Sequence, residues 1–69
     1  MSKFKGFLIS IQIGLESGDL GGLLDYIEIF SFREDNCLEI EAFLEGFDQI
    51  TEWRDKILYL RAEVSRLLA

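Results

Sequence analysis

Residues 50–67 read ITEWRDKILYLRAEVSRL, and apolar side chains recur there at alternating steps of three and four residues. This spacing places them on one face of an α-helix and leaves the charged side chains elsewhere. We therefore expect a long C-terminal amphipathic helix whose buried stripe comprises Ile50, Trp53, Ile57, Leu60, Val64 and Leu67. If Trp53 lies in the core, its replacement by alanine costs about 3 to 5 kcal/mol.

Three shorter segments before residue 50 carry the same helical spacing. Gly18 predicts a left-handed end to the first segment, and Asp19 supplies an acceptor for the free amides that open the second. Asn36 opens the third, with Glu39 at the position of a capping-box partner. The expected core residues are Phe4, Phe7, Leu8, Ile11 and Leu15, then Leu20, Leu23, Leu24, Ile27 and Phe30, then Cys37, Ile40, Phe43, Leu44 and Phe47.

The preferred fold is all-α, a small bundle of three to four helices that forms one domain over residues 1–69. Gly46 and Asp48 predict a break before the last helix; if Gly46 is merely tolerated, residues 36–68 form one helix instead. A second alternative is an α+β fold, because apolar residues also alternate strictly from Phe7 to Leu15. Residues 26–32 and 38–44 would then complete a three-stranded antiparallel sheet packed on one C-terminal helix.

The composition limits the chemistry that this chain can perform. It has 69 residues, one cysteine and no histidine, which excludes an internal disulfide and the common zinc cages. No glycine-rich phosphate loop or calcium loop is present, so we expect no enzyme, no cofactor and no bound metal. The unpaired Cys37 and a short, interrupted apolar run after Lys3 and Lys5 favour a cytoplasmic protein without a secretory signal.

Charge is concentrated in the middle of the chain. The net charge is −6, and residues 16–52 hold eleven acids against one base, Arg33. Because nucleic acids and anionic membranes bind Lys and Arg, we expect no direct binding to either. The basic flanks of the C-terminal helix are expected to pack within the chain's own bundle, against Glu39, Glu41, Glu45 and Asp48.

These features favour a non-enzymatic protein–protein interaction module, a small acidic inhibitor or regulator of a larger basic protein. The alternative is a homo-oligomeric structural protein, a homodimer for example, because apolar residues off the helical stripes form surface that association buries. Those residues are Ile9, Ile13, Ile29, Phe32, Leu38, Leu58 and Tyr59. The candidate partner-binding residues are Glu28, Glu34, Asp35, Glu39, Glu41, Glu45, Ile29, Phe32, Leu58 and Tyr59.

Overall fold

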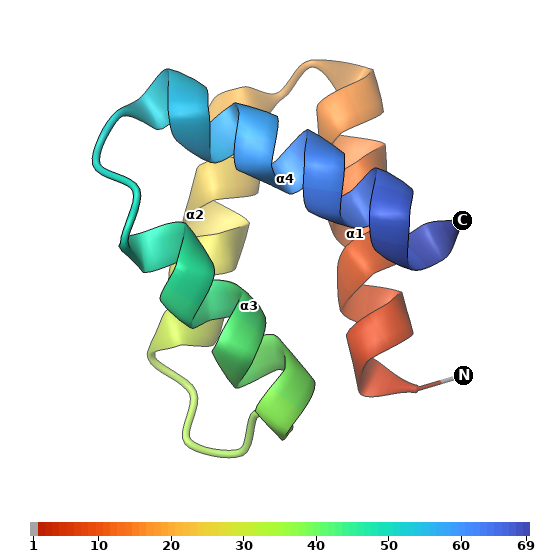
Figure 1. Ribbon diagram of the computed structural model, residues 1–69, viewed down its shortest axis with the longest axis vertical. Helices are drawn as coiled ribbons and strands as arrows, with labels where there is room; N and C mark the ends of the chain where they lie inside the picture. Colours follow the sequence, from red (N-terminus) through yellow and green to blue (C-terminus); the bar gives the residue numbers. More distant parts are fainter. Residues whose placement is uncertain (1) are drawn as a thin grey trace.

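The computed structural model describes residues 2–69, which form four α-helices and no strand (Figure 1). The helices are α1 (Lys3–Ser17), α2 (Leu20–Ser31), α3 (Leu38–Asp48) and α4 (Trp53–Leu68). The all-α prediction is therefore confirmed. The α+β alternative is wrong, because the three segments proposed as strands lie mainly within α1, α2 and α3.

Helices α1 and α3 each pack on all three other helices, and every helix–helix contact in the described chain involves one of them, so they are termed here the central helices. α4 packs most extensively on α1, which it crosses in Figure 1. In contrast, α2 and α4 do not pack on each other, and they flank the central pair. The start of α1 and the end of α4 lie on the same side of the molecule in Figure 1.

The core is a cluster of aliphatic and aromatic side chains from all four helices. Phe7 of α1 is 2 % exposed, and its ring centroid lies 4.8 Å from that of Phe30 and 5.4 Å from that of Phe43. Tyr59 of α4 joins this aromatic group, with its ring 5.3 Å from that of Phe43. The buried residues are Phe7, Leu8, Ile11, Leu23, Ile27, Ile40, Phe43, Leu44, Phe47, Ile57, Leu60 and Val64.

The junction between α1 and α2 forms as predicted. Gly18 ends α1 in the left-handed region, with φ of 79°, where glycine carries no side-chain penalty. Asp19 caps α2, since its Oδ1 accepts a hydrogen bond of 3.1 Å from the backbone N–H of Gly22. The glycine C-cap and the aspartate N-cap, both formed by residues of the turn itself, account for its conformation.

The capping-box prediction for α3 is wrong. The N-cap is the half-buried Cys37, and it makes no side-chain capping hydrogen bond. Asn36 instead turns back toward α2, where its Nδ2 donates a 2.7 Å hydrogen bond to the carbonyl oxygen of Phe30. That carbonyl belongs to the last turn of α2 and also accepts a 3.1 Å hydrogen bond from the backbone N–H of Arg33. Asn36 therefore completes the end of α2 rather than the start of α3.

Residues 36–68 form two helices rather than one. α3 continues through Gly46 to Asp48, so the break falls later than predicted, over residues 49–52. Glu52 is extended, with φ of −78° and ψ of 127°, and this separates Ile50 from the stripe that it was expected to begin. Trp53 starts α4 and is 54 % exposed, so the prediction that it lies in the core is wrong. It stands at the start of α4, beside a surface cleft that it lines together with Leu24 and Phe47.

The rest of the α4 stripe is buried as predicted. Ile57, Leu60 and Val64 are 6 %, 0 % and 3 % exposed, and Leu67 is half-buried. The neighbour that covers them is chiefly α1 and not the acidic α3. The expectation that the C-terminal helix packs mainly against the acidic residues of α3 is therefore wrong. Burial of apolar area against α1 contributes more to stability than surface ion pairs, which are worth about 0 to 1 kcal/mol each.

The basic side chains of α4 also find other partners. Arg66 pairs with Glu63 on its own helix. Lys56 donates a 2.8 Å hydrogen bond from Nζ to the carbonyl oxygen of Phe47, and its ammonium lies 4.1 Å from the centre of that ring. Neither base forms an ion pair with a carboxylate of α3 in the described residues.

Candidate protein-binding surface

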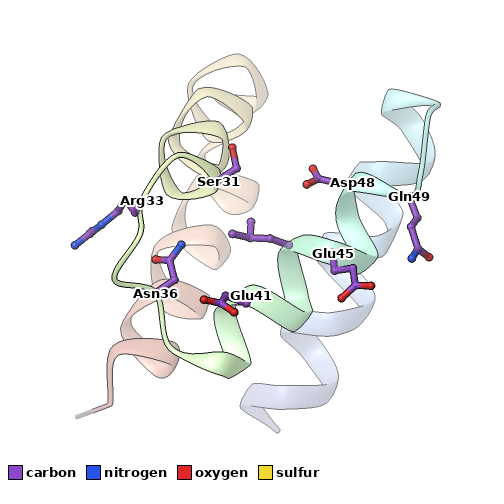
Figure 2. Close-up of a pocket in the computed structure, with 8 residues that line it drawn as sticks. Ser31, Arg33, Asn36, Glu41, Glu45, Asp48 and Gln49 are labelled. Atoms are coloured by element: carbon purple, nitrogen blue, oxygen red, sulfur yellow. The ribbon is translucent and has the colours of Figure 1, made fainter.

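A cleft of about 500 Å³ lies between the end of α2 and one face of α3 (Figure 2). α3 contributes carboxylates at positions 41, 45 and 48, which recur on successive turns of the helix. Glu41 and Asp48 are seven residues apart, or about 10 Å along the helix axis. The cleft, termed here the acidic cleft, is lined by Ser31, Arg33, Asn36, Glu41, Leu44, Glu45, Asp48 and Gln49.

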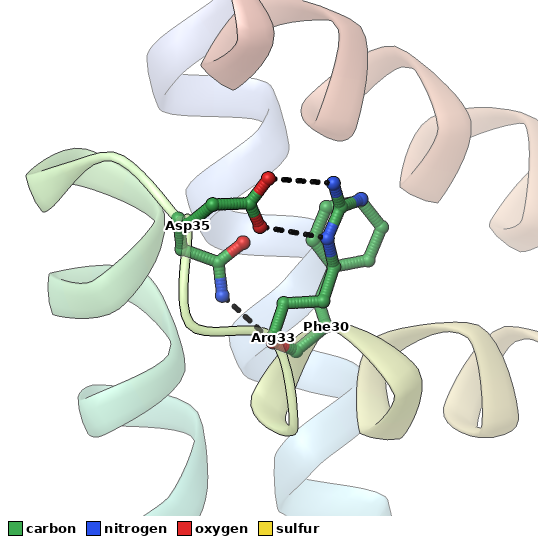
Figure 3. A network of polar contacts seen from close by, with 4 residues as sticks. Phe30, Arg33 and Asp35 are labelled. Carbon is green, nitrogen blue, oxygen red and sulfur yellow. Dashed lines mark hydrogen bonds and ion pairs between the residues drawn. The ribbon is translucent and has the colours of Figure 1, made fainter.

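The one base that lines the acidic cleft is paired outside it. Figure 2 shows Arg33 extending away from the α3 carboxylates. Its Nε and Nη2 donate hydrogen bonds of 3.1 and 3.2 Å to the two carboxylate oxygens of Asp35, and its guanidinium lies 5.1 Å from the Phe30 ring (Figure 3). The hydrogen bond and charge of Arg33 lower the pKa of Asp35. Because Arg33 makes two hydrogen bonds to one carboxylate, its guanidinium is held beside the α2–α3 loop.

The α3 carboxylates consequently face the acidic cleft without a cation from this chain. Within residues 2–69 the ion pairs are Arg33–Asp35 and Glu63–Arg66, and neither includes a carboxylate of α3. Glu45 and Asp48 also occupy the last turn of α3, which contains no base. A carboxylate there opposes the helix dipole and costs about 0.3 to 1 kcal/mol. Glu45 and Asp48 therefore lower the stability of α3 where they stand.

A second cleft of about 340 Å³ adjoins the first and shares Ser31 and Asp48 with it. Termed here the tryptophan cleft, it has an apolar character, and Lys56 at its edge is held down on Phe47 by the contacts described above. The exposed Trp53 stands at this edge. The lining residues are Leu24, Ile27, Glu28, Ser31, Phe47, Asp48, Trp53 and Lys56.

The structure brings together some of the predicted acidic residues. Glu41 and Glu45 line the acidic cleft, and Glu28 lines the adjoining tryptophan cleft. Glu39 lies elsewhere, in a cleft formed with Phe4 and Arg66. The remaining two, Glu34 and Asp35, belong to the α2–α3 loop, and Asp35 is engaged by Arg33.

Asp48 was not among the predicted site residues, although it lines both clefts. The sequence carried a signal for it, since it continues the spacing of Glu41 and Glu45 on α3. The predicted helix break placed Asp48 outside the helix that carries Glu41 and Glu45, whereas α3 extends through it.

The predicted apolar candidates are distributed over separate surfaces. Ile29 is exposed on α2, Phe32 is exposed at its C-cap, and Leu58 is exposed on α4. Tyr59 is half-buried, and its hydroxyl donates a 2.9 Å hydrogen bond to the carbonyl oxygen of Phe43. Tyr59 thus contributes to the packing of α4 on α3.

The described residues offer few other kinds of site. No group of three or more His, Cys, Asp or Glu side chains in residues 2–69 is placed to hold a metal ion. None of the four helices in that range has the length and apolar character to cross a membrane. No protein-family model, curated protein or solved structure matches this chain. The geometry and charge of the two adjoining clefts are therefore the basis for a functional proposal.

Proposed function

We propose that this chain is a non-enzymatic protein-binding module, an acidic regulator or inhibitor, whose two adjoining clefts receive a basic amphipathic segment of a larger protein. The observation that carries this proposal is the row of α3 carboxylates without a cation partner in the described chain. The proposal includes a cytoplasmic location, since one unpaired thiol, Cys37, suits a reducing compartment.

The two clefts have different roles in this proposal. The carboxylates of the acidic cleft attract Lys or Arg side chains, which accelerates encounter and selects against acidic partners. The apolar wall of the tryptophan cleft receives an apolar side chain, which contributes about 25 cal/mol for each Å² of apolar surface removed from water. Trp53 at its edge belongs to the residue types that most often dominate binding energy.

The spacing of the carboxylates specifies the partner further. Glu41, Glu45 and Asp48 follow the surface of one helix, so a partner helix laid along the cleft matches them with bases at the same intervals. The same negative charge repels phosphate groups, and direct nucleic-acid binding is no part of the proposal.

The test uses Trp53, the only tryptophan in the chain, as a fluorescent reporter. Its emission is titrated with a synthetic helical peptide that carries Lys at positions i, i+4 and i+7 and Leu on an adjacent stripe. A second peptide replaces each Lys with Glu. We expect the Lys peptide to change the emission saturably and to bind more weakly as salt rises. The Glu peptide is expected not to bind.

A matched pair of triple variants locates the binding site. Glu41→Gln/Glu45→Gln/Asp48→Asn removes the carboxylates of the acidic cleft, and Glu16→Gln/Asp25→Asn/Glu34→Gln removes as many charges outside it. We expect the first variant to bind the Lys peptide at least tenfold more weakly while its unfolding midpoint changes little. Loss of two carboxylates from the last turn of α3 stabilises the helix, and loss of Glu41 from the first turn opposes that gain. Equal losses in both variants, or a Lys peptide that does not bind, would refute the proposal.

A further inference from the structure

Helix α2 presents an apolar and acidic surface to solvent. Ile29 and Phe32 are 62 % and 78 % exposed, although both are large apolar side chains. Asp25 lies one turn before Ile29, and Glu28 lies one turn before Phe32. α2 contains no base. These residues, Asp25, Glu28, Ile29 and Phe32, are termed here the α2 surface.

Helix α4 presents an apolar surface of the opposite charge. Leu58 is 63 % exposed, with Arg54 one turn before it and Arg61 one turn after it. Asp55 also lies within a turn of Leu58, so this group has a net charge of one positive unit. Arg54, Asp55, Leu58 and Arg61 are termed here the α4 surface.

The two surfaces cannot cover each other within one chain. α2 and α4 flank the central helices α1 and α3 and do not pack on each other. Of the side chains that α2 and α4 direct toward the tryptophan cleft, only Glu28 also belongs to one of these two surfaces. Ile29, Phe32 and Leu58 therefore stay exposed in the isolated molecule, where each contributes apolar surface that association would remove from water.

We propose that the α2 surface of one copy docks on the α4 surface of a second copy. Apolar side chains then meet in the middle of the contact, and the acids of α2 face the arginines of α4, so the charges are complementary. The contact joins two different patches, so each dimer retains one free surface of each kind. Assembly therefore continues beyond the dimer until a ring closes or a chain of copies forms.

This assembly is separate from binding in the acidic cleft. Glu41, Glu45 and Asp48 take no part in either surface, and only Glu28 lies on both the α2 surface and the edge of the tryptophan cleft. The Glu41→Gln/Glu45→Gln/Asp48→Asn variant is therefore expected to self-associate as the wild type does. A failure of one proposal can then be told apart from a failure of the other.

Sedimentation velocity over a range of protein concentrations at low salt tests the proposal. We expect the average mass of the wild type to rise with concentration and to pass that of a dimer. Ile29→Arg/Phe32→Arg blocks the α2 surface, and Leu58→Glu blocks the α4 surface. Each variant alone is expected to remain monomeric, with a helical circular dichroism spectrum that verifies folding. Ile13→Arg is the control, since Ile13 is 61 % exposed on α1 and lies on neither surface.

Mixing the two blocked variants gives the decisive result, because each retains the surface that the other has lost. The mixture is expected to form a one-to-one dimer and nothing larger. A wild type that stays monomeric throughout would overturn the proposal, as would a mixture that stays monomeric. Association abolished by only one of the two variants would point to a symmetric contact of one surface with itself, which also overturns it.

Discussion

The hydroxyl of Tyr59 in α4 donates a 2.9 Å hydrogen bond to the backbone carbonyl oxygen of Phe43 in α3. Gly46 makes room for this contact, since a Cβ at that position would lie 2.6 Å from the hydroxyl oxygen. Burial raises the pKa of Tyr59, and the nearby Glu63 adds to the rise. A hydrogen bond between two helices thus depends on a neutral phenol and on a glycine.

Stability should consequently fall at alkaline pH. The pKa of Tyr59 is higher in the folded state than in the unfolded state, so its contribution is complete below about pH 10 and is lost as pH rises through the folded value. Tyr59→Phe should cost about 1 kcal/mol at neutral pH and reduce the alkaline loss. Urea unfolding at pH 7 and above pH 10 measures both effects. An unchanged alkaline loss in this variant would assign the loss to other groups.

Trp53 and Leu60 on α4 should respond very differently to truncation. Leu60 is fully buried, so Leu60→Ala should cost about 2 to 5 kcal/mol. Trp53 is more than half exposed, and Trp53→Ala should cost only about 1 kcal/mol. Thermal unfolding followed by circular dichroism compares the two. A loss at Trp53 as large as that at Leu60 would mean that the indole is buried in solution.

Gly14 and Gly6 offer a matched comparison within α1. A Cβ at Gly14 would lie 2.9 Å from Cδ1 and 3.3 Å from Cβ of Leu23, whereas a Cβ at Gly6 meets nothing within 4 Å. Gly6→Ala should stabilise the protein by about 0.5 to 1 kcal/mol through helix propensity. Gly14→Ala should bring the same gain in helix propensity. Its methyl group, however, would press on the buried Leu23, and this overpacking should cost about 1 to 3 kcal/mol, which cancels the gain. Equal gains in chemical unfolding would show that α1 and α2 are less closely packed.

Asn36→Asp separates two accounts of the α2–α3 loop. Aspartate is as good an N-cap as asparagine, so a capping role predicts little change. The carboxylate cannot donate to the carbonyl oxygen of Phe30, however, and loss of that hydrogen bond should cost about 0.5 to 1.5 kcal/mol, because the carbonyl keeps its bond from the Arg33 N–H. The free energy of unfolding of Asn36→Asp at neutral pH decides between them, and a neutral result would restore the capping role.

Local patterns were sufficient to predict the helices and the α1–α2 turn. The C-cap at Gly18 and the N-cap at Asp19 depend on a few neighbouring residues, so short-range rules apply to them directly. The rules failed at Trp53 because spacing alone cannot say where a helix begins. Ile50 and Trp53 keep the helical interval, yet the extended Glu52 lies between them.

Local sequence rules could not predict which helices pack on one another. Charge favoured α3 as the main neighbour of α4, but α1 takes that place, because burial of the Leu60 stripe depends on the apolar face that is nearest in three dimensions. The acidic cleft likewise depends on how the helices pack in three dimensions. The interval from Glu41 to Asp48 is visible in the sequence, whereas the cleft that they line exists only because Ser31 of α2 lies opposite.

The packing of the last helix on the first has a consequence for synthesis. While the ribosome is still making α4, α1 lacks the helix on which it packs most extensively, although the first three helices have already been translated. The nascent chain therefore completes its core only after α4 has emerged from the exit tunnel. Until then its apolar residues are available to chaperones.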